Sequence, residues 1–224
     1  MDISILYKDR DIIVCIKPVG ISSEEDGMPK ALGEVLKEQG ENPDIFPVHR
    51  LDMAVGGVMV FARSQKSAAR LSAIIAEHNM KKEYLAVIKG EPSEKSGIFK
   101  DLLFKDSRKN KSYVVSRMRK GVKEAELSYE VLSTAEYKDS PVSLVRISLK
   151  TGRSHQIRVQ FSSRKMPLLG DGKYGSTVNC DIALWSESLT FSHPFSKKEL
   201  SFSAHPQNTF PWDLFNNEKK DSAD

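Results

Sequence analysis

Asp52 is the residue of this chain whose type and position best suit it to chemistry. It lies in PVHRLDMAVGG, directly after His49, Arg50 and Leu51 and shortly before two glycines. A carboxylate between cationic residues and an apolar run is either a turn residue or an ionised group held for a reaction. The segment alone favours the turn residue, so the choice depends on which other residues accompany Asp52.

A second polar cluster stands in TGRSHQIR. Its candidates are Arg153, His155, Gln156 and Arg158. Ser154 is suited to cap a helix that begins here. Cations near a helix N-terminus carry a small electrostatic cost, which is a modest hint of function and leaves a functional site and a merely solvated helix end about equally supported. An arginine held against Asp52 would keep that carboxylate ionised and aim its oxygens.

Other candidates are weaker. Tyr84, in EYLAVIK, suits a site, although an aromatic residue in a strand more often packs in the core. GDGKYG matches GxGxxG but lacks a full strand before it and a long helix after it, so it predicts a turn-rich loop and not a dinucleotide site. His193 and His205 have no partners at metal-ligand spacing and are expected in turns. We therefore expect no cofactor and no metal.

The surrounding pattern predicts an α+β fold: a single catalytic domain over residues 1–215, with a large mixed, mainly antiparallel β-sheet flanked by helices and loops and a central cleft. Residues 216–224 are polar and are expected to be disordered. Helices are predicted at 29–39, after Ser64 and after Ser154. Strands are predicted at 3–7, 12–17, 57–62, 83–89, 113–118, 125–132, 143–150, 183–185, 189–191 and 199–203.

Charge is unevenly distributed along the 224 residues. Residues 1–49 hold ten acidic and five basic residues, whereas residues 95–123 hold ten basic and two acidic ones. A paired hairpin of 113–118 with 125–132, bearing cations on its exposed face, fits a polyanion-binding surface, although a solvated charged face is the simpler alternative. The two distant cysteines, the charged start of the chain and the lack of a long apolar run favour a soluble, cytoplasmic protein with no membrane partner.

Four blocks together resemble the RluA-type family of RNA pseudouridine synthases, in the family's order over most of the chain. They are ILYKDRDIIVCIKPVG, HRLD with GGVMVFARS, KEYLAVIKG, and TGRSHQIR followed by PLLGDGKYG and LTFSHPF. The resemblance implies an isomerase that converts specific uridines in structured ribosomal or transfer RNA, acts as a monomer and needs no cofactor. It also implies that Asp52 is the catalytic aspartate, that Tyr84 lies against the target uracil, and that Arg158 pairs with the aspartate.

The same resemblance implies RNA contacts. Arg50 would reach into the RNA beside the flipped base, and substrate binding is further expected of His49, Arg153, His155 and Gln156. Two places depart from the family: Val55 and Gly56 stand where Thr and Ser are usual, and Gln160 stands where His is frequent. Neither departure removes a catalytic group.

Two alternatives belong to other classes of protein. One is a non-catalytic RNA-binding domain that uses the basic strands and has no use for Asp52. The other is a hydrolase with Asp52 and a glutamate as an acid–base pair, which is disfavoured because the signature blocks contain no second suitable acid.

Overall fold

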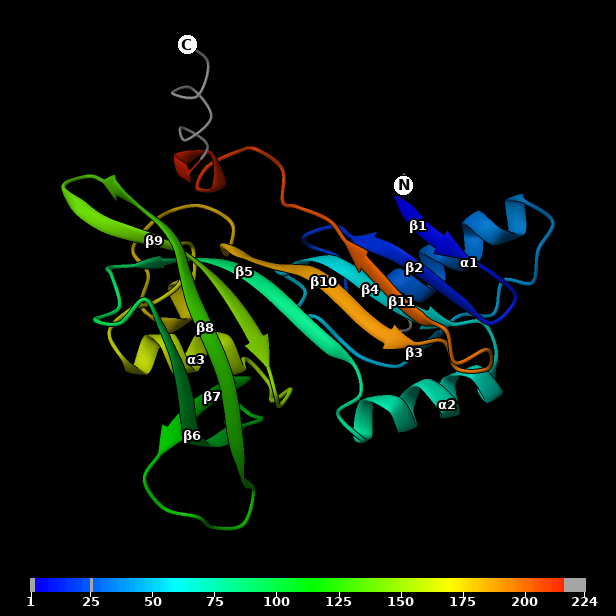
Figure 1. Cartoon of the computed structure of the whole chain (residues 1–224), viewed down its shortest axis with the longest axis horizontal. Helices are drawn as coiled ribbons and strands as arrows, with labels where there is room; N and C mark the ends of the chain where they lie inside the picture. The colour runs from blue at the N-terminus through cyan, green and yellow to red at the C-terminus, as the bar shows by residue number, and fades with distance from the viewer. Residues whose placement is uncertain (1–2, 25, 216–224) are drawn as a thin grey trace. The chain divides into compact units, whose positions relative to one another are not determined.

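The computed structural model describes residues 3–24 and 26–215, and the chain divides into two compact units (Figure 1). The first comprises Met1–Lys82 with Trp185–Pro206, and the second Glu83–Leu184 with the residues from Gln207 onward. The predicted α+β class with a mixed, mainly antiparallel sheet is confirmed. The predicted disordered tail, 216–224, lies outside the described residues.

The first unit is built on a mixed sheet. Its strands are β1 (Ile5–Lys8), β2 (Ile12–Lys17), β3 (Phe46–Pro47), β4 (Gly56–Ala62), most of β10 (Leu184–Ser192) and β11 (Glu199–Ser203). β1 and β2 form the predicted hairpin, β2 pairs antiparallel with β4, and β10 runs parallel to β4. Every residue of β4 is buried, as its continuous apolar run predicts for a central strand.

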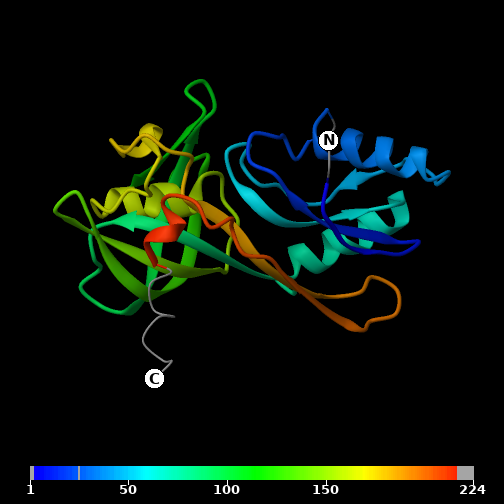
Figure 2. The same cartoon turned by 90° about the horizontal axis from the view of Figure 1, so that it is seen from above.

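Two helices cover this sheet. α1 (Met28–Glu38) begins near its proline, and α2 (Gln65–Ala76) is capped by Ser64, whose hydroxyl accepts a hydrogen bond from Ser67 N over 3.1 Å. Leu71 of α2 belongs to a buried cluster with residues of β2, β4 and β10. Figure 2 shows α1 on the other side of these strands, which explains why β4 is buried on both faces.

The second unit is an antiparallel sheet with one helix. Its elements are most of β5 (Lys81–Lys89), β6 (Ser96–Asp106), β7 (Lys111–Val115), β8 (Val122–Tyr137), β9 (Ser140–Leu149), α3 (Gln156–Ser163) and the 3₁₀ turns η1 (Gly172–Tyr174) and η2 (Trp212–Phe215). The strand order is β5-β9-β8-β6-β7. Phe161 of α3 packs on Phe99 and Tyr129, with ring centroids 5.1 and 5.9 Å apart. This aromatic contact places α3 on the sheet.

Two predictions about the strands are wrong. β6 was not predicted and lies between β7 and β8, so residues 113–118 do not pair directly with 125–132. The charged residues that interrupt its apolar ones obscured this strand. β10 is one strand where two were predicted, because the buried polar residues Ser186 and Glu187 break its apolar pattern.

The start of α3 also differs. His155, in a left-handed conformation with φ 53°, precedes the helix, and Ser154 does not cap it. Instead the carbonyl of Ser154 accepts a hydrogen bond from the Ser112 hydroxyl at 2.7 Å. In the described ranges, no helix has the length and apolar character required to cross a bilayer.

Candidate active site

The loop that carries Asp52 is anchored on both sides of that residue. The hydroxyl of Ser23 donates to the Leu51 carbonyl at 2.9 Å and accepts from the Leu51 N–H at 3.2 Å. The Met53 carbonyl accepts from Gly20 N at 2.9 Å. Both neighbours of Asp52 are therefore fixed to the segment after β2, and the partly exposed aspartate stands between two fixed points.

Lys17 supports this loop from inside the protein. Its side chain is fully buried, and Nζ donates to the carbonyls of Pro18, Ile21 and Met53 at 2.9, 2.7 and 3.2 Å. Burial lowers the pKa of Lys17 to about 8, and the nearby Asp52 carboxylate opposes that shift. Lys17 thus holds the main chain beside Asp52 and places a positive charge near it.

The departures from the family at Val55 and Gly56 are accommodated by packing. Val55 is buried, and its N–H donates to the Asp52 carbonyl at 2.9 Å, which closes the turn. A Cβ on Gly56 would lie only 2.4 Å from Cζ3 of Trp185. The indole N–H of Trp185 donates to the Ala204 carbonyl at 2.7 Å, which fixes the ring. Glycine at 56 is therefore required by the tryptophan beside it.

His49 and Arg50 occupy contrasting positions. The backbone N–H of Val60 donates to His49 Nε2 at 3.1 Å, so the neutral ring carries its proton on Nδ1. Nδ1 is buried with no partner among the described residues. Burial and the charge of Lys82 hold the pKa of His49 well below its usual range. Arg50 is exposed and pairs with Glu24 at 2.7 Å, so His49 has a structural contact and Arg50 faces solvent.

The second unit brings the TGRSHQIR residues together at the start of α3. Both ends of the Gln156 side-chain amide form hydrogen bonds within the protein. Oε1 accepts from Thr151 Oγ1 and Arg153 N, and Nε2 donates to the Glu126 carbonyl. The exposed side chain of Arg153 donates to the Glu124 carbonyl at 2.9 Å. RNA contacts by these two residues stay predictions, and the contacts seen here organise the turn before the helix.

Arg158 forms a forked ion pair with Asp171. Nε and Nη2 donate to Oδ2 and Oδ1 of the aspartate at 2.7 and 2.8 Å, and both side chains are almost completely buried. The guanidinium lies 5.2 Å from the ring centre of Tyr174. The Tyr174 hydroxyl is 3.0 Å from Nδ1 of His155, so the two predicted residues share one neighbour.

Tyr84 lies on β5, opposite Ile147 of β9, and is 6% exposed. Asp52 belongs to the first unit, whereas Tyr84 and Arg158 belong to the second. The approach of these three residues to one another therefore remains a prediction. Gln160, the other departure from the family, is fully buried and donates to Asp101 Oδ2 at 2.7 Å, so it serves the packing of α3 on β6.

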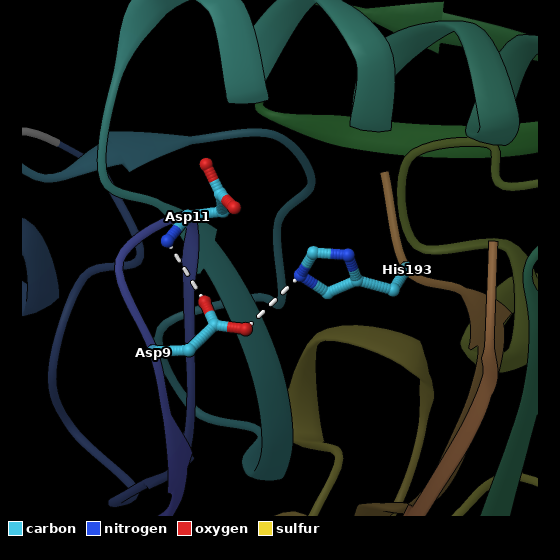
Figure 3. A group of neighbouring side chains, drawn as sticks. All are labelled: Asp9, Asp11 and His193. Atoms are coloured by element: carbon cyan, nitrogen blue, oxygen red, sulfur yellow. Dashed lines mark hydrogen bonds and ion pairs between the residues drawn. The ribbon is translucent and has the colours of Figure 1, made fainter. Parts of the chain in front are cut away.

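Asp9, Asp11 and His193 form a cluster that resembles a metal site (Figure 3). Its hydrogen bonds argue otherwise. Asp9 accepts from the backbone N–H groups of Asp11 and Ile12 and lies 3.0 Å from His193 Nε2. Nδ1 of His193 accepts from two backbone N–H groups of its own turn. His193 therefore lies in a turn, as predicted. Its contact with Asp9 joins the β10–β11 connection to the β1–β2 turn.

Four residues that hold the Asp52 loop or contact Arg158 were not predicted from the sequence: Lys17, Ser23, Asp171 and Tyr174. Lys17 carried a usable signal, because a lysine in the apolar run IIVCIK must either reach solvent or find buried acceptors. GDGKYG was predicted to be a turn-rich loop and was part of a block that resembles the family, but its contact with Arg158 could not be predicted, because the two segments are separate in the chain.

The fold and these residues define an α+β protein with an anchored loop aspartate, a buried arginine–aspartate pair and a basic strand region. A family model described as RNA pseudouridylate synthase matches residues 11–163. The chain belongs to this family, within its RluA type, and it is an RNA pseudouridine synthase, an isomerase that acts on RNA.

Individual relatives agree. The chain is 34% identical over 206 residues to the dual-specificity RNA pseudouridine synthase RluA of Escherichia coli K12, covering 89% of this chain and 91% of that protein. It is 30% identical over 225 residues to tRNA pseudouridine synthase C of Haemophilus ducreyi, covering 91% of each. The human RNA Pseudouridylate Synthase Domain Containing 1 shares the fold, with a TM-score of 0.77 at 24% identity, over 94% of this chain and 85% of that one.

Proposed function

We propose that this protein converts a uridine in structured transfer or ribosomal RNA to pseudouridine, with Asp52 as the reacting carboxylate. The observation that supports this most directly is the anchoring of Leu51 and Met53 on either side of Asp52. A loop held at both ends presents its middle side chain in a fixed place, as positioned catalytic groups require. A simple turn aspartate needs no such support.

The reaction breaks the bond between uracil N1 and the sugar C1′, turns the base, and forms a bond from C5 to C1′. The proton on C5 leaves and N1 gains one, so atoms and electrons balance without an oxidant or a cofactor. In this proposal Asp52 adds to the base or to the sugar and then assists proton removal. Arg158 contacts Asp52 and keeps it ionised, and Tyr84 stacks on the uracil.

Two kinds of observation support RNA of this class as the substrate: the names of the relatives and the exposed cations of the chain. One named relative is a tRNA pseudouridine synthase, and the other is called dual-specificity. In the basic segment, Lys105, Arg108, Lys109, Arg117 and Lys120 are exposed in the region of β6 and β7. Cations on an exposed hairpin suit phosphate contacts, which would offset the few kcal/mol needed to unstack a target base. The enzyme is expected to act as a monomer.

The test is the variant Asp52→Asn. We expect it to lose pseudouridine formation by a factor of at least about 10³, since it removes the reacting group, while the affinity for RNA stays within about twofold. Unmodified transfer and ribosomal RNA transcripts would be incubated with pure enzyme and pseudouridine mapped chemically. RNA affinity would be measured by fluorescence anisotropy.

The matched control is Asp44→Asn, which removes an exposed carboxylate from the same unit. It should retain the wild-type rate. Turnover by Asp52→Asn at the wild-type rate would show that another residue carries the chemistry. Wild-type protein that binds these RNAs but modifies no uridine in them would refute the proposed substrate class.

A further inference from the structure

The GDGKYG loop, residues 170–175, lies against the arginine of α3. We propose that Asp171 and Tyr174 of this loop are positioning residues for the reaction, which fix the plane and direction of the Arg158 guanidinium. The inference rests on the function proposed above, in which Arg158 contacts the reacting carboxylate.

The ion pair fixes one edge of the guanidinium. Asp171 is completely buried, and in the described parts of the chain Arg158 is its one ion-pair partner. Two parallel N–H···O bonds at 2.7 and 2.8 Å define the plane of the fork as well as its distance. Because the guanidinium is rigid, fixing the Nε and Nη2 edge also sets where the Nη1 edge points.

Tyr174 fixes the face of the same group. Its ring centre lies 5.2 Å from the Arg158 guanidinium carbon. The ring is itself held: its hydroxyl accepts from the backbone N–H of Ser112 at 2.8 Å and lies 3.0 Å from His155 Nδ1. A ring held at its far end by β7 and by the residue before α3 cannot tilt without breaking these bonds.

The loop also contacts the β6–β7 hairpin, near the exposed cations named above. Nζ of Lys111 donates to the carbonyl of Lys173, and Nζ of Lys173 donates to the carbonyl of Asn110 at 3.1 Å. The Ser112 hydroxyl bonds the Ser154 carbonyl beside α3. The strand that we propose for RNA contact and the helix that carries Arg158 are therefore joined through one short loop.

A second fork, at the residue that follows α3, provides a built-in comparison. Arg164 donates to Asp101 Oδ2 and Oδ1 at 2.9 and 3.2 Å, and it lies 3.9 Å from the ring centre of Phe99. This pair is more exposed, with 30% of the arginine side chain and 12% of the aspartate accessible, against 7% and 0% for the first pair. Both forks hold the helix on its surroundings, but only Arg158 has a role in the proposed reaction.

The test compares Asp171→Asn with Asp101→Asn in the full-length enzyme. Asparagine keeps the shape but loses the charge and one acceptor of the fork. A displacement of a catalytic group by about 1 Å costs on the order of 100-fold in rate, so we expect kcat of Asp171→Asn to fall by at least that factor, with KM for RNA within about twofold. Asp101→Asn should lower the melting temperature while kcat stays within about twofold.

Equal loss of kcat in both variants would overturn the inference, since the integrity of α3 would then explain both. A wild-type kcat in folded Asp171→Asn would overturn it directly. Circular dichroism establishes whether each variant is folded. If Asp171→Asn does not fold, Tyr174→Phe decides, because it keeps the ring and removes its anchoring hydroxyl. The inference expects a several-fold loss of kcat with unchanged KM, and an unchanged kcat contradicts it.

Failure of the proposed function would look different. In that case the wild-type enzyme itself would leave the tested transcripts unmodified, and no kcat values could be compared.

The placement of Arg158 can also be measured without turnover, through its Nε–H resonance in a ¹⁵N-labelled sample. Protection of this proton from exchange, lost in Asp171→Asn and kept in Asp101→Asn, supports the positioning; equal protection in Asp171→Asn contradicts it.

Discussion

The loop around Asp52 and the site around Arg158 are held in different ways. In the first unit, side chains bind the main chain on either side of the aspartate: Ser23 bonds Leu51, and Lys17 bonds Met53. In the second unit, a side chain binds a side chain, because Asp171 grips the guanidinium of Arg158 itself. The position of Asp52 is therefore set by contacts of the main chain on either side of it, whereas the position of the Arg158 guanidinium is set by an ion pair of its own side chain.

This difference predicts that variants of the two sets of supporting residues will affect stability and kcat differently. A residue that fixes the main chain determines the path of a whole loop, so its loss should reduce stability and activity together. A residue that fixes a functional group should affect kcat more than it affects folding, if the rest of the helix remains packed. The variants below test the first half of this comparison, and the Asp171 and Asp101 variants test the second.

The largest effect is expected for Lys17→Met. Methionine fills similar space but leaves the carbonyls of Pro18 and Ile21 without their Nζ–H donor, at a cost of about 1–3 kcal/mol each. Relief from burying a charge offsets part of this. We expect the free energy of unfolding to fall by about 2–4 kcal/mol and kcat to fall with it. Urea denaturation and the pseudouridine assay measure the two quantities.

Lys30→Met is the control, because Lys30 lies exposed on α1 and should change neither quantity. A Lys17→Met enzyme that loses stability but keeps the wild-type kcat would break the comparison. The Asp52 loop would then hold its course without this anchor.

An intermediate effect is expected for Gly56→Ser, which restores the residue usual in the family. The new Cβ would meet the Trp185 ring at 2.4 Å, a conflict the fixed indole cannot relieve without moving. Overpacking of this kind costs about 1–3 kcal/mol. The change should therefore destabilise this chain although it makes the sequence more typical, and thermal or urea unfolding would measure it.

A double-mutant cycle with Trp185→Ala separates this clash from other effects. If the ring causes the cost, Gly56→Ser should be milder by about 1 kcal/mol or more in the Trp185→Ala background. Additive effects of the two changes would show that glycine is needed at 56 for a reason other than the tryptophan.

The sequence anticipated much of the fold because its strongest signals are local. The all-apolar run of β4 and the Ser64 cap of α2 are contained in a few adjacent residues and were predicted correctly. β6 was missed because its burial depends on partners on both sides, which its own mixed pattern does not reveal. The start of α3 was misplaced because His155 takes a left-handed conformation, which is uncommon for any residue other than glycine.

For the candidate site, the sequence predicted the motifs but not the contacts that support them. HRLD and TGRSHQIR indicated which residues to consider, because the chemistry lies in their types and order. Their supports could not be predicted, since Lys17 reaches Met53 and Arg158 reaches Asp171 across gaps in the chain. A contact between two segments is a property of the packed structure, whereas a motif is a property of one segment.

The smallest effect in the comparison concerns His49, which holds the main chain of β4 through Val60. Its pKa in the folded state lies well below 6.5, the usual value, because burial and Lys82 disfavour the charged ring. Below pH 6.5 the unfolded chain therefore binds a proton that the folded chain does not. Stability from this group is complete above that pH and falls as the pH decreases, by up to about 1.4 kcal/mol per pH unit.

His49→Gln isolates this contribution, because a glutamine oxygen can still accept from Val60 and does not titrate. Urea unfolding between pH 7.5 and 5 should show the wild type losing stability faster than the variant, by about 2 kcal/mol over the acidic part of the range. Parallel curves for the two proteins would mean that His49 takes up its proton without leaving its place, and that the backbone anchors of the Asp52 loop do not depend on its neutrality.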